Sequence, residues 1–167
     1  LMSKDVYVLA EQRDGVIQKV GIELIGKATE LAADLGQQVV AVLLGSGIKD
    51  KADVLIKHGA NKVVVVNDPM LAEYVTEPYA KALYEVIKKC DPEIVLFGAS
   101  SIGRDLAPRV SARVHTGLTA DCTKLEIAAD TKLLNMTRPA FGGNIMATIV
   151  CKNHRPQMAT VRPGVMA

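Results

Sequence analysis

Two loops in this 167-residue chain carry residue types that could do chemistry, and the first is FGASSIGRD at residues 97–105. It lies between an apolar run and a helical pattern, where backbone N–H groups at a helix N-terminus bind anions. Gly98 and Gly103 have the spacing of a phosphate-binding loop, in which lysine and then serine or threonine follow the second glycine. Arg104 and Asp105 occupy those positions here. The loop therefore lacks the residues that would hold phosphate and magnesium.

The same loop has an interpretation that needs no ligand. Small residues allow a strand to turn tightly into a helix, and Ser100 or Ser101 can cap the first helical turn. An earlier glycine pair, Gly45 and Gly47, lacks the third glycine of the dinucleotide-binding pattern. We favour the tight connection, with a stand-alone adenine-nucleotide-binding or hydrolysing domain as the alternative.

The second loop lies within TRPAFGGNIMATI, residues 137–149. Arg138 precedes a proline, which holds it extended, while Gly142 and Gly143 permit the positive φ angles of a tight turn. Asn144 offers both a donor and an acceptor. A hairpin turn requires only a pair such as Asn-Gly or Gly-Gly, so the arginine exceeds what a turn demands. These residues alone support a ligand-contacting loop and a plain hairpin equally.

No other pattern of side chains predicts catalysis. The three histidines stand apart from any nucleophile motif, and neither HExxH nor clustered carboxylates occur, so metal-dependent hydrolysis is not supported. We expect each histidine at the surface or in a structural role. The three cysteines lack CxxC spacing, and we expect them to be buried and inert, with the last two in strands. These residues are His58, His115, His154, Cys90, Cys122 and Cys151.

Alternating patterns define the elements that must position these loops. Short Val-, Ile- and Leu-rich runs alternate with helical spacing over the first two thirds of the chain, as in a parallel sheet flanked by helices. Leu24, Ala28, Leu31 and Leu35 form one helical stripe, and Gly36 ends it. The expected strands are 6–11, 38–45, 62–68 and 92–100, and the expected helices are 20–36, 52–60, 76–90 and 102–115.

The pattern changes after Gly117, where helical spacing gives way to strand-like runs at 121–129, 132–140, 144–151 and 157–164. We expect antiparallel or mixed pairing there, either extending the first sheet or forming a second one. The predicted fold class is therefore α/β: a three-layer, Rossmann-like, mostly parallel sheet with a β-rich C-terminal part. We expect a single domain over residues 1–167.

Composition narrows the classes of partner. The chain is 49% hydrophobic and 23% charged, with a formal net charge of +2. Its charges are interspersed, without the basic run that binds nucleic acid or a membrane surface. The N-terminal sequence resembles neither a signal peptide nor a membrane span. We therefore expect a cytoplasmic protein.

Several stretches together resemble one family, the N-terminal domain of the electron transfer flavoprotein alpha subunit. They are VYVLAEQRDG at the start, residues 97–127, TRPAFGGNIMATI, and the closing PQMATVRPGVM. The resemblance covers essentially the whole chain in order. It implies an adenine nucleotide alpha hydrolase-like fold, and a bacterial electron carrier subunit rather than an enzyme.

The resemblance also implies partners and a cofactor. Members of the family are heterodimers with a beta subunit, and they pass electrons from acyl-CoA dehydrogenase-type partners of fatty acid β-oxidation, or from NADH in bifurcating complexes, to an acceptor through FAD. The resemblance implies that FAD is held chiefly by a C-terminal domain of alpha, which we expect to lie outside these 167 residues. Carried over from the family, Arg138, Gly142, Gly143 and Asn144 would face a flavin or AMP site completed by the beta subunit, with Arg138 stabilising negative charge on a reduced flavin.

Overall fold

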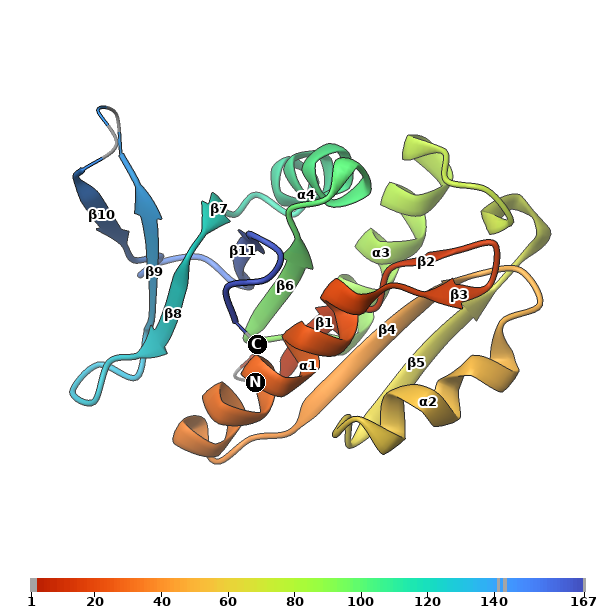
Figure 1. The fold of residues 1–167 in the computed structure, drawn as a ribbon, viewed down its shortest axis with the longest axis horizontal. Helices are drawn as coiled ribbons and strands as arrows, with labels where there is room; N and C mark the ends of the chain where they lie inside the picture. Colours follow the sequence, from red (N-terminus) through yellow and green to blue (C-terminus); the bar gives the residue numbers. More distant parts are fainter. Residues whose placement is uncertain (1–2, 141, 143, 167) are drawn as a thin grey trace.

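A parallel sheet of six strands forms the centre of the protein, in the order β5-β4-β1-β6-β11-β7 (Figure 1). The computed structural model describes residues 3–140, 142 and 144–166. Every neighbouring pair in this sheet is parallel, which confirms the expected α/β class. The strands are β1 (Val6–Leu9), β4 (Val39–Gly45), β5 (Lys62–Asn67), β6 (Ile94–Gly98), β7 (Leu118–Cys122) and β11 (Gln157–Val161).

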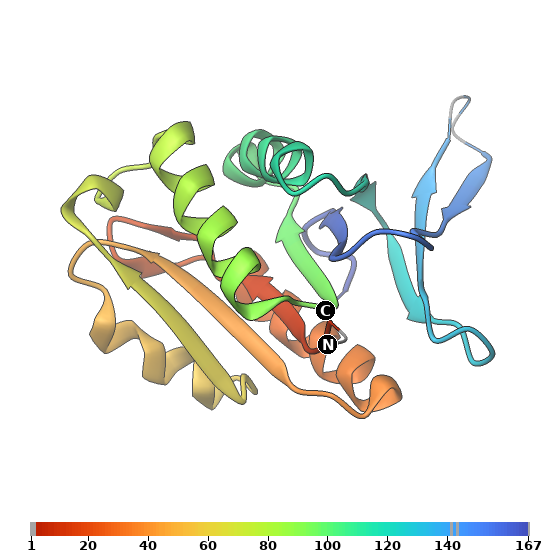
Figure 2. The same ribbon diagram turned by 180° about the vertical axis from the view of Figure 1, so that it is seen from behind.

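Helices cover both faces of this sheet. The apolar residues of α1 and α2 belong to one buried cluster and those of α3 and α4 to another, so the sheet lies between two helical layers. Figure 2, the view from behind, shows α3 crossing in front of the strands. The helices are α1 (Lys19–Leu35), α2 (Ala52–Lys57), α3 (Thr76–Cys90) and α4 (Ser101–Arg113), with short 3-10 turns η1 (Lys49–Lys51) and η2 (Pro69–Leu71).

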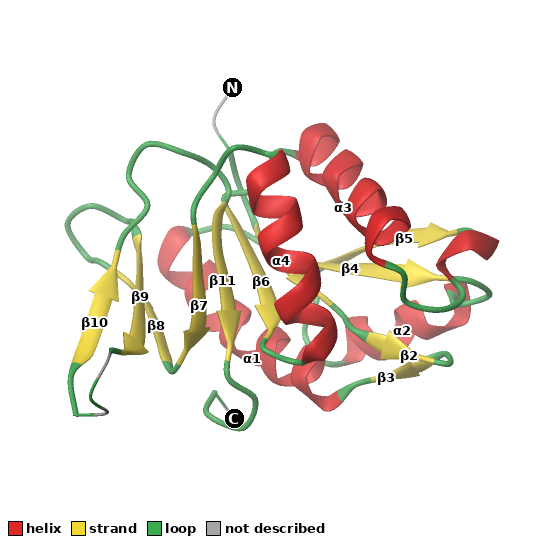
Figure 3. Cartoon of the chain, turned by 90° about the horizontal axis from the view of Figure 1, so that it is seen from above, coloured by secondary structure: helices red, strands yellow, loops and turns green. Residues whose placement is uncertain are grey.

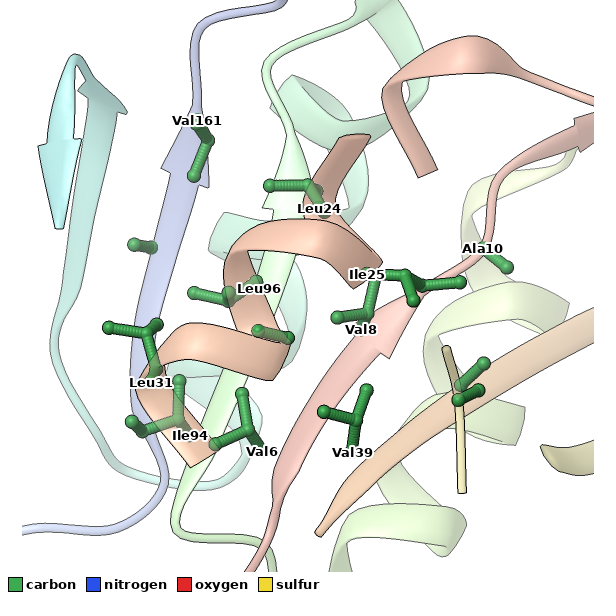
Figure 4. Packing of buried hydrophobic residues seen from close by; sticks show 14 of the residues in the cluster. Val6, Val8, Ala10, Leu24, Ile25, Leu31, Val39, Ile94, Leu96 and Val161 are labelled. Atoms are coloured by element: carbon green, nitrogen blue, oxygen red, sulfur yellow. The ribbon is translucent and has the colours of Figure 1, made fainter. Parts of the chain in front are cut away.

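The core follows from the alternation of side chains along the central strands. Val6 and Val8 of β1 pack with α1, whereas Tyr7 and Leu9 belong to the cluster with α3 and α4. Leu24 on the predicted stripe of α1 is fully buried against these strands (Figure 4). Burying one such leucine stabilises the fold by about 1.5–3 kcal/mol. The helical stripe therefore fixes α1 across the sheet.

The β-rich C-terminal part divides between two sheets. β7 and β11 extend the parallel sheet, and β11 is inserted between β6 and β7. β8 (Lys124–Ile127), β9 (Leu134–Pro139) and β10 (Met146–Ile149) form a three-stranded antiparallel sheet at one end of the molecule, beyond β7 (Figures 1 and 3). The C-terminal part therefore both extends the parallel sheet and forms a second sheet, which are the two arrangements that the sequence left open.

A small hairpin between β1 and α1 was not predicted. β2 (Gln12–Arg13) pairs with β3 (Val16–Ile17) in antiparallel register. Asp14 and Gly15, with φ angles of 52° and 80°, form the turn between them. Two consecutive positive φ angles characterise the tight turns that Asp-Gly favours, so the Asp-Gly pair was the available signal.

The predicted end of α1 is confirmed, whereas Pro108 and two of the cysteines differ in part from their predictions. Gly36 ends α1 with a left-handed φ of 66° and donates to the carbonyls of Ala32 and Ala33, as its type predicts. Pro108, expected near the first turn of α4 or at a kink, lies in the helix interior. The expectation that Cys151 lies in a strand and is buried is wrong: it is half-buried in the connection after β10, because pairing of that strand ends at Ile149. Cys90 is likewise half-buried rather than buried.

Candidate functional site

The loops after β1 and β6 meet where the direction of strand order reverses, the usual position of ligands in open α/β sheets. β6 runs directly into α4 here (Figure 3). Ser100 caps α4, because its hydroxyl accepts a hydrogen bond from the Gly103 N–H at 3.1 Å. The same hydroxyl donates to the carboxylate of Glu11, whose side chain is only 6% exposed. The predicted serine cap is confirmed, and a buried carboxylate completes it.

The spacing of Gly98 and Gly103 has a packing reason. A Cβ atom added at Gly103 would lie 1.8 Å from the Gly98 carbonyl oxygen. A Cβ added at Gly98 would lie 2.6 Å from a methyl carbon of Val20 at the start of α1. Glycine is thus required where two helices approach β6 closely. The favoured interpretation of this loop, a tight strand-to-helix connection, accounts for both glycines.

Buried polar groups hold the β2–β3 hairpin against the sheet edge. The Gln12 side chain donates to the Leu44 carbonyl at 3.1 Å and to the Tyr79 hydroxyl at 3.3 Å, and accepts from the Gly15 N–H at 2.9 Å. Tyr79 in turn donates to the Leu71 carbonyl at 2.6 Å. Burial raises the pKa of Tyr79, so its hydroxyl stays protonated as a donor. These contacts fix the loop that carries Glu11.

The second candidate loop connects β9 to β10. Arg138 pairs across the hairpin with Ala147, and the loop closes through a 2.7 Å hydrogen bond from the Ala140 N–H to the Ile145 carbonyl. Gly142 has a φ of 93°, as expected for its turn, and the Asn144 N–H donates to its carbonyl at 3.0 Å.

The candidate residues of this hairpin lie at its exposed end. Arg138, Gly142 and Asn144 are all exposed. An added Cβ at Gly142 would meet nothing within 4 Å, so the loop leaves open space beside it. Gly143, the fourth predicted residue, lies outside the described residues.

Strand alternation decides which way Arg138 points. Leu134 and Met136, four and two residues earlier in the chain, face the core, so Arg138 lies on the same inner side of β9. The Thr123 N–H donates to the Thr137 carbonyl at 2.8 Å, which brings β9 beside the end of β7. Arg138 therefore extends from the core face of its sheet toward the carboxyl edge of the parallel sheet.

An ion pair that sequence reasoning missed lies at this edge. Arg162 binds both carboxylate oxygens of Asp121, at 3.2 and 2.7 Å. The hydrogen bond from Arg162 lowers the pKa of Asp121, and the positive charges of Arg104 and Arg138 act in the same direction. Arg162, in the segment after β11, is the hydrogen-bonded partner of this carboxylate, and Arg104 of α4 and Arg138 of β9 add positive charge to its surroundings. Their separation in sequence left no local pattern to reveal the cluster.

The remaining sequence predictions concern histidines, metals and membranes. His58, His115 and His154 are all exposed, as expected. The described part of the chain has no group of three or more His, Cys, Asp or Glu side chains placed to hold a metal ion. Within residues 3–140, 142 and 144–166, no helix has the length and apolar character needed to cross a membrane.

Comparison with known proteins finds relatives over nearly the whole chain. An electron transfer flavoprotein subunit alpha from Clostridium acetobutylicum is 54% identical over 97% of this chain and 48% of its own length. A subunit of the same name from Thermoanaerobacterium thermosaccharolyticum is 54% identical over 98% of this chain and 49% of its own. The LctC subunit of a lactate dehydrogenase (NAD(+),ferredoxin) from Acetobacterium woodii is 52% identical over 95% and 38%, respectively.

The chain spans about half the length of the two alpha subunits it matches. A family profile described as the electron transfer flavoprotein domain matches residues 6–167, which include both loops, the serine cap and the hairpin arginine. The chain therefore belongs to the electron transfer flavoprotein domain family.

Proposed function

We propose that residues 1–167 form a single domain, the N-terminal domain of an electron transfer flavoprotein alpha subunit, acting as the non-catalytic part of an electron carrier. The observation that carries this proposal is the match over residues 6–167 together with relatives named as alpha subunits at 54% identity. FAD, when bound in the complete protein, supplies the one- and two-electron chemistry. The domain supplies charged side chains and a contact surface to a cofactor site that is completed by the rest of the alpha subunit and by the beta subunit.

The exposed β9–β10 hairpin supports contact with a beta subunit. Ile145, Met146 and Ile149 are 63%, 52% and 38% exposed, although large apolar side chains are usually buried. They lie on one strand and the loop before it, and Met146 and Ile149, three residues apart, project to opposite faces of β10. A beta subunit that covers this end of the hairpin would remove these side chains from water and meet the candidate residues of the same hairpin.

Arg138, Gly142, Gly143 and Asn144 are the proposed cofactor-contacting residues. The arginine fits an electron-rich flavin, because its guanidinium is always charged and carries several N–H donors. Gly142 leaves open space for a ring system, and Asn144 is exposed with both a donor and an acceptor. Their chemistry fits a flavin edge contributed by a neighbouring subunit.

The experiment replaces Arg138 with glutamine in the heterodimer formed by the full-length alpha subunit and its beta subunit. Loss of a positive charge beside the flavin destabilises its anionic reduced forms, so the midpoint potential is expected to become more negative. Potentiometric titration measures it. Arg138→Lys restores the charge and is expected to recover part of the shift.

Arg109→Gln is the matched control, because it removes the same charge from an exposed pair with Glu77 on the α3 and α4 side. An unchanged midpoint potential in an intact Arg138→Gln heterodimer would show that Arg138 has only a structural role in the hairpin and does not act on the flavin. Equal shifts in Arg138→Gln and Arg109→Gln would contradict a local contact with the flavin.

The alternative function, adenine nucleotide binding or hydrolysis by the chain alone, predicts a different result. Titration of the isolated chain with ADP, ATP and FAD is expected to show no submillimolar affinity, and such affinity would overturn the carrier proposal.

We further propose a bacterial cytoplasmic carrier with acyl-CoA dehydrogenase-type or other redox partners. Relatives that include the LctC subunit and an acryloyl-CoA reductase electron transfer subunit beta, 45% identical, support a place among bifurcating complexes as well.

A further inference from the structure

A groove of about 590 Å³ runs along α1, beside the helical stripe that packs on the sheet. Its lining residues on α1 recur at spacings of three and four, so they form a second stripe on the same helix. Met166, from the segment after β11, completes the lining. Ile22 and Met166 are half-buried and pack against the main core cluster, which gives the groove an apolar floor. The lining residues on α1 are Lys19, Ile22, Glu23, Gly26, Lys27 and Glu30.

The segment after β11 leads the chain to this groove. The two carboxylate oxygens of Glu23 accept hydrogen bonds from the Gly164 N–H at 2.9 Å and from the Met166 N–H at 2.8 Å. Hydrogen bonds to a charged acceptor are stronger than those between neutral groups. These bonds hold the segment beside α1 (Figure 1), so polypeptide that continues from Met166 starts at the wall of the groove.

Gly26 leaves the middle of the groove open. It lies inside a 17-residue helix, where glycine is about 1 kcal/mol less favourable than alanine. A Cβ added at Gly26 would meet no described atom within 4 Å, so packing within this domain does not require a glycine there. A second backbone can approach α1 more closely at a glycine than over a side chain.

We propose that the alpha-subunit polypeptide that follows residue 167 lies along this groove, so that α1 joins the N-terminal domain to the rest of the alpha subunit. The inference rests on the proposed function, under which further alpha-subunit polypeptide follows these residues. The part matched here is 48% and 49% of the length of two relatives named alpha subunits. From Lys19 to Glu30 the stripe is about 16 Å long at the rise of an α-helix, and about five extended residues cover that length.

The side chains of the groove suit a polypeptide better than a charged ligand. Among the lining residues Lys19 and Lys27 balance Glu23 and Glu30, and Lys27 lies 3.0 Å from Glu30. Because the lining has no excess charge, binding must come from the apolar floor and from backbone hydrogen bonds. We expect the occupant to place an apolar side chain over Gly26 and polar groups along the rim.

Cysteine labelling in the heterodimer of the full-length alpha subunit and its beta subunit tests whether the groove is covered. Gly26→Cys places a thiol in the groove, and Ala33→Cys is the matched control, because it places one at an exposed position of the same helix outside the groove. N-ethylmaleimide is expected to label Gly26→Cys at least about tenfold more slowly, which corresponds to about 1.4 kcal/mol for opening the groove. Equal labelling rates, mapped by mass spectrometry, would overturn the proposal.

Photo-cross-linking of the same heterodimer identifies what covers the groove. Glu30 is on the rim and its side chain is 68% exposed, so a benzophenone maleimide can be attached to Glu30→Cys without filling the floor. The main product is expected to join this position to alpha-subunit residues that follow 167. Products mainly with the beta subunit or with a second alpha subunit would overturn the proposal, as would the absence of any such product. These measurements do not depend on the flavin, so an open groove would leave the carrier proposal standing, whereas the potentiometric titration of the Arg138 variants tests the carrier proposal alone.

Discussion

Replacing Gly103 with alanine tests how closely α4 must approach β6. The added Cβ would lie 1.8 Å from the Gly98 carbonyl oxygen, whereas real Cβ atoms essentially never come closer than 3.0 Å. The helix must therefore shift by about an ångström or more, and overpacking of this kind costs about 1–3 kcal/mol. The shift also strains the Ser100 bond to the buried Glu11 carboxylate, and bonds to charged groups contribute about 1.5–3 kcal/mol.

One term opposes this loss. Alanine is more favourable than glycine inside a helix by about 1 kcal/mol. The expected net decrease in the free energy of unfolding is therefore roughly 1.5–5 kcal/mol, the two costs less this gain. A protein of this size loses about 2–4 °C of Tm for each kcal/mol, so Tm is expected to fall by roughly 3–20 °C.

Gly26→Ala in α1 is the matched control. Both glycines lie inside helices, but nothing stands within 4 Å of a Cβ at Gly26, so only the helical preference acts there. That variant is expected to gain about 0.5–1 kcal/mol. Urea unfolding followed by far-ultraviolet circular dichroism measures both, because the chain has no tryptophan for a fluorescence signal. A stability change of the same sign in the two variants would refute the close-approach argument.

Two further predictions concern titrating groups. The ion pair with Arg162 lowers the pKa of Asp121, so its stabilising effect is complete above the unfolded-state pKa of about 3.9 and disappears as pH falls through the folded-state value. The urea midpoint of Asp121→Asn should therefore lie below that of the wild type at pH 7, and the two midpoints should approach each other in acid. A difference in midpoint that stays the same at every pH would contradict this. Burial raises the pKa of the Cys122 thiol to about 11, so iodoacetamide, mapped by mass spectrometry, should label it after Cys90 and Cys151. The free energy of unfolding should also fall at higher pH, once the Cys122 thiol of the unfolded chain ionises. Early labelling of Cys122 would count against its burial.

Local pattern was enough to predict the four helices, most of the strands and part of the site, but not the β2–β3 hairpin. Periodicity identified the α1 stripe and its end at Gly36, because both depend on residues within a few turns of one another. The Ser100 cap was predictable for the same reason, since it binds a residue three positions away. The motifs at 97–127 and 137–149 likewise pointed to the family that the comparison establishes.

The tertiary structure decided the contacts that join distant parts of the chain. Ser100 meets Glu11 across 89 residues and Arg162 meets Asp121 across 41, so neither pair leaves a periodic signal. The position of β11 between β6 and β7 was also not predictable, because a strand-like pattern predicts an extended conformation but not which strands will be its neighbours. The glycine spacing at 98 and 103 was visible in the sequence, but only the distance between α4 and β6 shows that it serves packing. Residue types determined what each segment could form, and long-range packing determined which charges came together.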